Sequence, residues 1–254
     1  EFFDKEPAMT MINEQRIPKE VRDAYAPFLT QMIDLHGDNL ISVFIYGSAT
    51  GTNFIPKSSD INSVIVVKEV SRDTLEKSLK PIAAVKRRRI EAPLILTRDH
   101  IQSSLDVFPI EFSDMKENYV VVYGDDPLSE ICIQGEHIRL FCEQQIKGKL
   151  IRIRQAYLEV GLRRRGIEML MRESLNALMP VLRSLLRLKG AAVPADKGLL
   201  LTEIGTVFGM NVDVMSAIWN ETKNNERVGG RSAREAFGDY IQRLEQLAEA
   251  VDQL

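Results

Sequence analysis

The chain has 254 residues, a net charge of −3 and an apolar fraction of 44%. This length suits one large or two small domains, and the apolar fraction is enough to build a core. The slightly acidic balance argues against a protein that binds nucleic acid through its overall charge. We expect no membrane span, because no apolar run approaches the length that a transmembrane helix needs. The two cysteines match no metal-binding spacing, and we expect them to be reduced in a cytoplasmic protein.

The first half of the chain mixes helical and strand-like patterns. Helices are expected from Ile17 and from Ser71, with one or two helical turns after Arg98. The expected strands cover 40–46, 61–67, 92–97, 108–112 and 119–124. The second helix is expected to bury the apolar side chains Leu75, Leu79, Ile82, Ala83 and Val85. This order predicts an α/β fold in which helices pack on a mixed sheet.

After Pro127 the strand-like runs end and helical spacing takes over. The helices expected there cover 135–165, 167–188, 198–208, 212–224 and 232–254. Pro180 lies inside the second of these and is expected to kink or split it. We therefore predict two domains, an α/β domain over 1–127 and an all-α helical bundle over 128–254.

The most informative stretch joins two of the expected strands. The apolar run over 40–46 ends at Gly47-Ser48, and a loop rich in Gly, Thr, Asn, Pro and Ser follows. The next β-branched run then begins with the carboxylate of Asp60 at its edge. A small residue at a strand end lets the backbone approach a ligand, and hydroxyls and free amides can hold phosphate oxygens. A carboxylate beside them can hold the metal ion that phosphates bring.

The residues expected to contact phosphates are Gly47, Ser48, Thr50 and Ser59. Asp60 is expected to ligate the metal ion. The alternative is a purely structural one, in which Gly47-Ser48 forms a tight turn and Asp60 caps the edge of a strand.

This pattern resembles the nucleotidyltransferase superfamily, which has the polymerase-β-like fold. Its signature is a strand that ends in Gly-Ser, then Asp-apolar-Asp on the next strand, with a third acidic residue on a later strand. Asp60 matches the first acid, whereas Asn62 stands in place of the second. For the third we expect Glu111, on the strand over 108–112, as a general base or metal ligand. The resemblance implies that Asp60, Asn62 and Glu111 hold Mg²⁺.

The resemblance also implies an activity. It implies transfer of a nucleoside monophosphate from a nucleoside triphosphate, most often AMP from ATP, to a hydroxyl of a small-molecule or protein acceptor. Many members of the superfamily carry a helical C-terminal domain that helps to form the acceptor site. The resemblance does not name the acceptor.

Asn62 leaves two alternatives open. An amide oxygen can ligate a divalent ion, but the loss of one negative charge weakens the attraction for a second ion. Either the protein is an enzyme with an atypical Asp-x-Asn site, or it is catalytically impaired and keeps the fold to bind nucleotide or a protein partner. The oligomeric state also stays open, a homodimer included.

Basic side chains gather in three places, over 86–89, 147–154 and 163–165. We expect solvated helix ends and faces there, because long basic side chains often cover apolar surface in this way. The alternative is contact with a triphosphate or an anionic acceptor. No aromatic residues interleave the charges over 147–154, which argues against a platform that stacks nucleic-acid bases.

Overall fold

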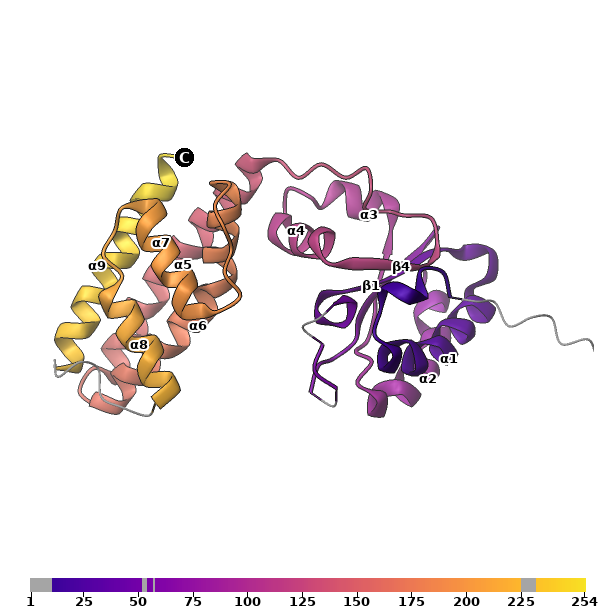
Figure 1. Cartoon of the computed structure of the whole chain (residues 1–254), viewed down its shortest axis with the longest axis horizontal. Coiled ribbons are helices and arrows are strands. Elements are labelled where there is room, and N and C mark those ends of the chain that lie inside the picture. Colours follow the sequence, from indigo (N-terminus) through magenta and orange to yellow (C-terminus); the bar gives the residue numbers. More distant parts are fainter. Residues whose placement is uncertain (1–10, 52–53, 57, 225–231) are drawn as a thin grey trace, which may run out of the picture. The chain divides into compact units, whose positions relative to one another are not determined.

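The computed structural model describes residues 11–51, 54–56, 58–224 and 232–254 (Figure 1). The chain divides into two compact units. The first comprises residues 1–105 and 111–132, and the second comprises residues 106–110 and 133–254.

The first unit is built on a mixed sheet of four strands in the order β3-β2-β1-β4. The strands are β1 (Leu40–Tyr46), β2 (Asn62–Val67), β3 (Leu94–Thr97) and β4 (Tyr119–Gly124). β1 pairs antiparallel with both β2 and β4, whereas β2 pairs parallel with β3. The parallel pair is joined through a helix, which is the crossover that such a pair requires. The predicted mixed sheet is confirmed.

Helices cover both faces of this sheet. The helices before residue 118 are α1 (Lys19–His36), α2 (Arg72–Val85), α3 (Arg98–Ser103) and α4 (Pro109–Glu117). Short 3-10 turns are η1 (Glu14–Arg16), η2 (Gly37–Asn39), η3 (Gly47–Thr50) and η4 (Lys86–Arg88). Figure 1 shows α1 and α2 on one side of the sheet and α3 and α4 on the other. On the first side, Val43 and Ile65 of the sheet and Phe28 of α1 belong to one buried cluster.

The buried face of α2 differs from the prediction. Leu75, Leu79 and Ala83 were expected to be buried, but all three are exposed, the two leucines at 48% and 64%. The helix instead buries Thr74, Ser78, Pro81 and Val85. The Ser78 hydroxyl lies 3.1 Å from Nε2 of buried His36, at the end of α1. The contact between α1 and α2 is therefore polar in part, and this hydrogen bond satisfies two buried polar groups.

The strand predicted over 108–112 is wrong, because residues 109–112 lie in helix α4 and Phe108 directly precedes it. Pro109 is the first residue of the helix, where its missing N–H costs nothing and its fixed φ suits the helix. Glu111 lies in the first turn, where the helix dipole favours a negative charge. Ile110, Phe112 and Met115 are buried. The alternation of apolar residues over 108–112 therefore reflects helix packing and not a strand.

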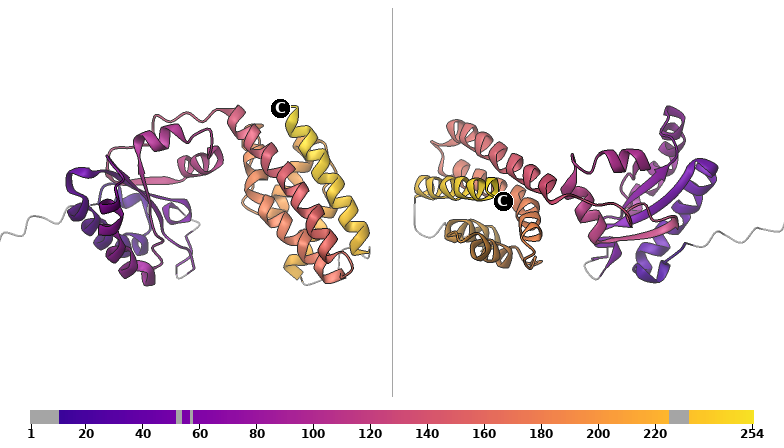
Figure 2. Two further views of the ribbon diagram at one scale, coloured as in Figure 1. Left: turned by 180° about the vertical axis from the view of Figure 1, so that it is seen from behind. Right: turned by 90° about the horizontal axis from the view of Figure 1, so that it is seen from above.

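The second unit is a helical bundle, as predicted. Its helices in the described chain are α5 (Gly135–Val160), α6 (Arg164–Leu188), α7 (Lys197–Phe208), α8 (Asp213–Asn224) and α9 (Ala233–Asp252). They lie alongside one another (Figure 2). Helix α6 contacts α5, α7, α8 and α9, so it forms the centre of the bundle. Pro180 lies within α6 and does not split it.

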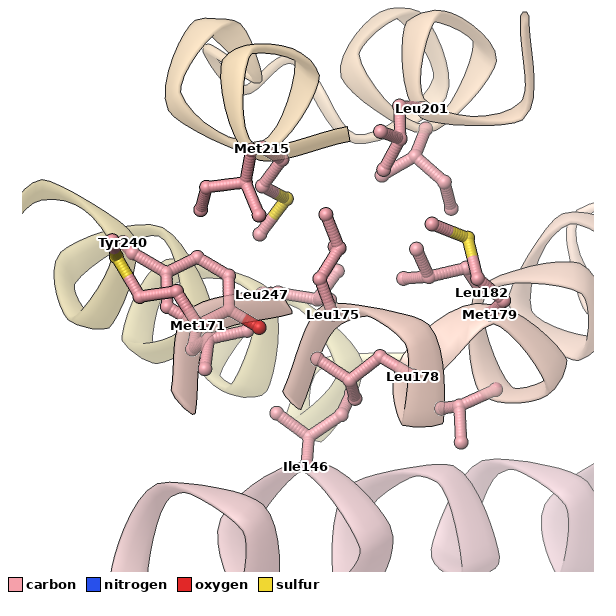
Figure 3. Packing of buried hydrophobic residues seen from close by; sticks show 14 of the residues in the cluster. Ile146, Met171, Leu175, Leu178, Met179, Leu182, Leu201, Met215, Tyr240 and Leu247 are labelled. Carbon is pink, nitrogen blue, oxygen red and sulfur yellow. The ribbon is translucent and has the colours of Figure 1, made fainter. Parts of the chain in front are cut away.

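The core of the bundle forms around α6. Figure 3 shows Leu175, Leu178 and Leu182 of α6 among side chains from the other helices, such as Ile146 of α5 and Leu247 of α9. These side chains are at most 2% exposed. Burial of a leucine stabilises a fold by about 1.5–3 kcal/mol, so α6 supplies a large part of the stability of this unit.

Within the part of the chain that the structure describes, no helix combines the length and apolarity that crossing a membrane requires.

Truncation of Leu182 to alanine is expected to destabilise the bundle by about 2–5 kcal/mol, because it leaves a cavity in the centre of a packed core. Urea unfolding followed by tryptophan fluorescence measures this loss, because the only tryptophan, Trp219, packs against the same cluster. Leu158→Ala is the control, because Leu158 lies on α5 but is 85% exposed; it should change stability by less than about 0.5 kcal/mol. Equal effects of the two variants would contradict the central position of α6.

Candidate active site

The end of β1 has the backbone that the sequence pattern predicted. Gly47 follows the strand with φ of +77°, a conformation that favours glycine, and its N–H donates to the Asn118 carbonyl at 2.8 Å. An added Cβ at this position would meet no atom within 4 Å. Ser48 is exposed in the first turn of η3. The chain therefore turns sharply here, with open space beside the glycine.

Two of the predicted phosphate ligands use their hydroxyls within the loop. The Thr50 hydroxyl donates to the Gly47 carbonyl at 2.8 Å. The Ser59 hydroxyl accepts the N–H of Ile55 at 3.0 Å. These bonds shape the loop, and they make Thr50 and Ser59 supports of the turn in this structure.

A parallel ladder fixes the residues on the other side of the loop. The Ile61 N–H donates to the Arg89 carbonyl at 2.8 Å, and the Glu91 N–H donates to the Ile61 carbonyl at 3.1 Å. Ile61 and Ile90 form the bridge and are both buried in the cluster beneath α1. Because side chains alternate along a strand, the neighbours Asn62 and Glu91 project from the opposite face.

Four side chains consequently form a row across one edge of the sheet. Tyr46 pairs with Asn62 on one side and with Tyr119 on the other. Glu91 lies beyond Asn62, on the segment that leads into β3. Adjacent strands are about 4.8 Å apart, so each member of the row is a direct neighbour of the next. Asp60 lies two residues before Asn62 in the chain.

The two tyrosines of this row are neutral hydrogen-bonding groups. Burial raises the pKa of Tyr46 above its usual range. Burial and a hydrogen bond to Asp126 raise the pKa of Tyr119 to about 12. The Tyr119 hydroxyl donates to Asp126 Oδ2 at 2.8 Å, and its ring contacts Phe44 edge-on with centroids 5.8 Å apart. The rings of Tyr46 and Tyr119 therefore form a partly buried aromatic surface next to Asn62.

Asp60 is bound by an arginine. Nη2 of Arg89 lies 2.9 Å from Oδ1 of Asp60, and Nε donates to the same oxygen at 3.1 Å. Nη2 also donates to the Ser58 carbonyl at 2.6 Å. The side chains of Asp60 and Arg89 are each 45% exposed, so the pair is open to solvent.

The structure also shows an acidic residue that the sequence prediction missed. Glu111 is exposed on α4, and the strand that follows α4 is separated from β2 by β1. Glu91, in contrast, lies on the segment directly paired with Asp60-Ile61-Asn62. The sequence contained a signal for Glu91. Strands joined by a crossover helix run parallel, so acidic residues that precede two such strands lie at the same edge of the sheet. Glu91 precedes β3 just as Asp60 precedes β2.

The donor set can be compared with what Mg²⁺ requires. The carboxylates of Asp60 and Glu91 and the amide of Asn62 supply hard oxygen atoms, which are the ligands that Mg²⁺ takes. Over the described ranges, no three side chains of His, Cys, Asp or Glu come together as a metal site. Asn62 is not one of these four residue types. The residues fit one divalent ion, provided that Arg89 leaves Asp60.

The basic residues of α5 lie in the second unit, several of them in ion pairs. Lys147 pairs with Glu143, and Arg154 pairs with Glu245. The bond to Lys147 lowers the pKa of Glu143, and the same bond raises the pKa of Lys147. Arg164 pairs with Glu168 at 2.7 Å. These pairs favour the interpretation of a solvated, ion-paired helix surface.

Comparison with known proteins shows the fold. No protein-family model matches the chain, and no curated protein does. Among solved structures, spectinomycin adenyltransferase AAD(9) from Enterococcus faecialis, solved with ATP and spectinomycin, is similar. The alignment covers 86% of this chain and 97% of that one, with a TM-score of 0.50 and 12% identity. The chain has a nucleotidyltransferase-like fold. At 12% identity the similarity shows the fold alone and does not show an activity.

Substitution of Gly47 by alanine is expected to destabilise the first unit by about 1–2 kcal/mol, because an L residue is strained at positive φ. The neighbouring Gly51 provides the matched control, because its φ is −154° and an added Cβ meets nothing within 4 Å. Gly51→Ala should leave stability unchanged or raise it by up to about 1 kcal/mol. Amide hydrogen exchange of β1 and β2 measures both effects, and equal protection in the two variants would contradict the strained turn.

Proposed function

We propose that this protein is a nucleotidyltransferase that moves a nucleoside monophosphate from a nucleoside triphosphate to a hydroxyl group of an acceptor. The observation that carries the proposal is the convergence of Asp60, Asn62 and Glu91 on one sheet edge, beside the sharp turn at Gly47-Ser48. Turn and acids together provide a place for phosphates and oxygen ligands for their metal ion. If the turn at Gly47-Ser48 were only structural, it would not require acidic residues beside two neighbouring strands.

ATP is the donor we propose to test first. The similar adenyltransferase was solved with ATP, and it shares the architecture that positions this edge. The acceptor is a hydroxyl on a small molecule or a protein. The similar structure also holds spectinomycin, which makes spectinomycin the first small molecule to try.

The reaction assigns a task to each residue. The acceptor oxygen attacks the α-phosphorus, the bond from phosphorus to the bridging oxygen breaks, and pyrophosphate leaves. Glu91 is the general base that takes the acceptor proton, because it has a carboxylate next to Asn62 at the open edge. Asp60 and Asn62 would hold a divalent cation through their side-chain oxygens, and this cation would orient the phosphates. A magnesium ion bound there would neutralise phosphate charge and lower the pKa of the attacking hydroxyl.

A second candidate function is nucleotide or protein-partner binding without catalysis. Two observations favour it: Asn62 lacks the negative charge of an aspartate, and Arg89 neutralises Asp60. Binding of a nucleoside triphosphate without transfer to any acceptor would support this function. Absence of binding to every nucleotide would reject the proposed enzyme as well as a nucleotide-binding role.

Calorimetric titration with ATP is expected to show binding in the presence of Mg²⁺ and little without it. Asp60→Ala should abolish the Mg²⁺-dependent part, because it removes a charged ligand of the cation. Asp38→Ala is the control: Asp38 is exposed in η2, which precedes β1, at the opposite end of that strand from Gly47. Binding that survives Asp60→Ala unchanged would remove Asp60 from the site.

Glu91→Gln is expected to slow transfer by about 100-fold to 10,000-fold, because glutamine has the shape of glutamate but cannot accept the proton. Release of pyrophosphate from ATP, screened over hydroxyl-bearing acceptors, measures the rate. Glu111→Gln is the matched control and should leave the rate near that of the unmodified protein. The reverse pattern would restore Glu111 as the base and exclude Glu91.

A further inference from the structure

The positively charged side chain of Arg89 already contacts the carboxylate of Asp60, which is the group expected to hold a metal ion. Two nitrogens of Arg89 contact Oδ1 of Asp60, at 2.9 and 3.1 Å. Nη2 of this guanidinium also donates to the Ser58 carbonyl, at 2.6 Å. Oδ1 of Asp60 therefore has a positively charged partner in the place where a metal ligand needs a free lone pair.

The backbone holds Arg89 in this place. Its φ is 59°, in the left-handed region that residues other than glycine rarely adopt. Its N–H donates to the Lys86 carbonyl at 3.1 Å, and its carbonyl accepts the N–H of Ile61 at 2.8 Å. The arginine is thus anchored through its main chain directly beside Asp60, although its side chain is half exposed and can move.

The charges at this edge are unequal. Asp60 and Glu91 each carry one negative charge, Asn62 carries none, and Arg89 contributes one positive charge. Tyr46, the neighbour of Asn62 on β1, is neutral, because burial raises its pKa. The net charge of the group is close to −1, which attracts a divalent cation only weakly in the absence of other anions.

We propose that Arg89 is a built-in competitor of the divalent cation at Asp60. The guanidinium occupies Oδ1 of Asp60 and offsets the charge of the carboxylate, so the protein binds free divalent ions poorly. The inference rests on the proposed function for its second half: phosphate oxygens draw the guanidinium from Asp60 into a bidentate contact and add negative charge. Metal ion and triphosphate then bind together, and by linkage each strengthens the binding of the other.

A half-exposed ion pair makes this exchange feasible. Pairs at such exposure contribute little to stability, so a phosphate group can replace the carboxylate as the partner of Arg89 without a large cost. The other three basic residues of the run, Lys86, Arg87 and Arg88, are exposed on η4. They raise the local potential for a phosphate, but the ion pairs that the structure shows at Asp60 come from Arg89.

The test measures Mn²⁺ binding to the full chain without nucleotide, by the electron paramagnetic resonance signal of free Mn²⁺. Arg89→Gln is expected to lower the Kd for Mn²⁺ about tenfold, which corresponds to about 1.4 kcal/mol. Arg88→Gln, which removes the same charge one residue away, should change the Kd by less than about twofold, as for an exposed and screened charge. In the double variant Asp60→Asn with Arg89→Gln the gain should vanish, because the gain acts through Asp60.

Arg89→Gly is a second variant that removes the guanidinium without straining the backbone at this position. Glycine adopts a φ of 59° without strain, so this variant removes the cation and suits the backbone. It should show the same gain in Mn²⁺ affinity as Arg89→Gln. An unchanged Kd for Mn²⁺ in folded Arg89→Gly would overturn the inference.

An ATP arm separates this inference from the proposed function. With Mg²⁺ present, Arg89→Gln should bind ATP about tenfold more weakly than the unmodified protein, because the phosphates lose a guanidinium partner. Failure of every variant to bind ATP would overturn the proposed function and the phosphate contact, whereas a gain in Mn²⁺ affinity would still support the competition at Asp60. ATP binding with no change in Mn²⁺ affinity would support nucleotide binding and would overturn the competition at Asp60.

Discussion

The parallel bridge between Ile61 and Ile90 is the interaction on which the candidate site depends. It joins segments that are far apart in sequence, and the hydrogen bonds on either side of it fix Arg89 and Glu91 beside Asp60 and Asn62. Both isoleucines are buried beneath α1, so the apolar core holds the bridge in place. The polar row exists because residues adjacent to a buried bridge must point to the other face.

Charge at this edge distinguishes the chain from the pattern it resembles. A site with an acid at every position repels itself until metal ions bind, and this cost is reduced here by a neutral Asn62 and by the guanidinium of Arg89. Less negative charge therefore gathers at this edge in the absence of a ligand than in a site with three acids. Both proposed functions, binding without catalysis and catalysis with a cation that arrives with the substrate, are consistent with these two features.

Local sequence signals predicted much of the fold, and tertiary contacts decided the rest. Ser71 and Ser232 each open a helix with a capping box, a signal contained within four residues. Pro109 carried a similar local signal for a helix start, but apolar alternation around it favoured a strand. Glu91 was missed because its role depends on which strand lies next to it. The contact of Arg89 with Asp60 follows from a bridge that no short window of sequence contains.

The place of β1 in the sheet also constrains how the protein is made. β1 lies between β2 and β4, and its pairing with β4 joins Ser42 to Gly124. During synthesis β1 and β2 can pair early, but the edge of β1 that faces β4 stays open until that later strand emerges. An unpaired edge in an apolar strand invites pairing with other chains. The order of the strands along the chain therefore leaves one edge of β1 exposed for longer than the edge that pairs with β2.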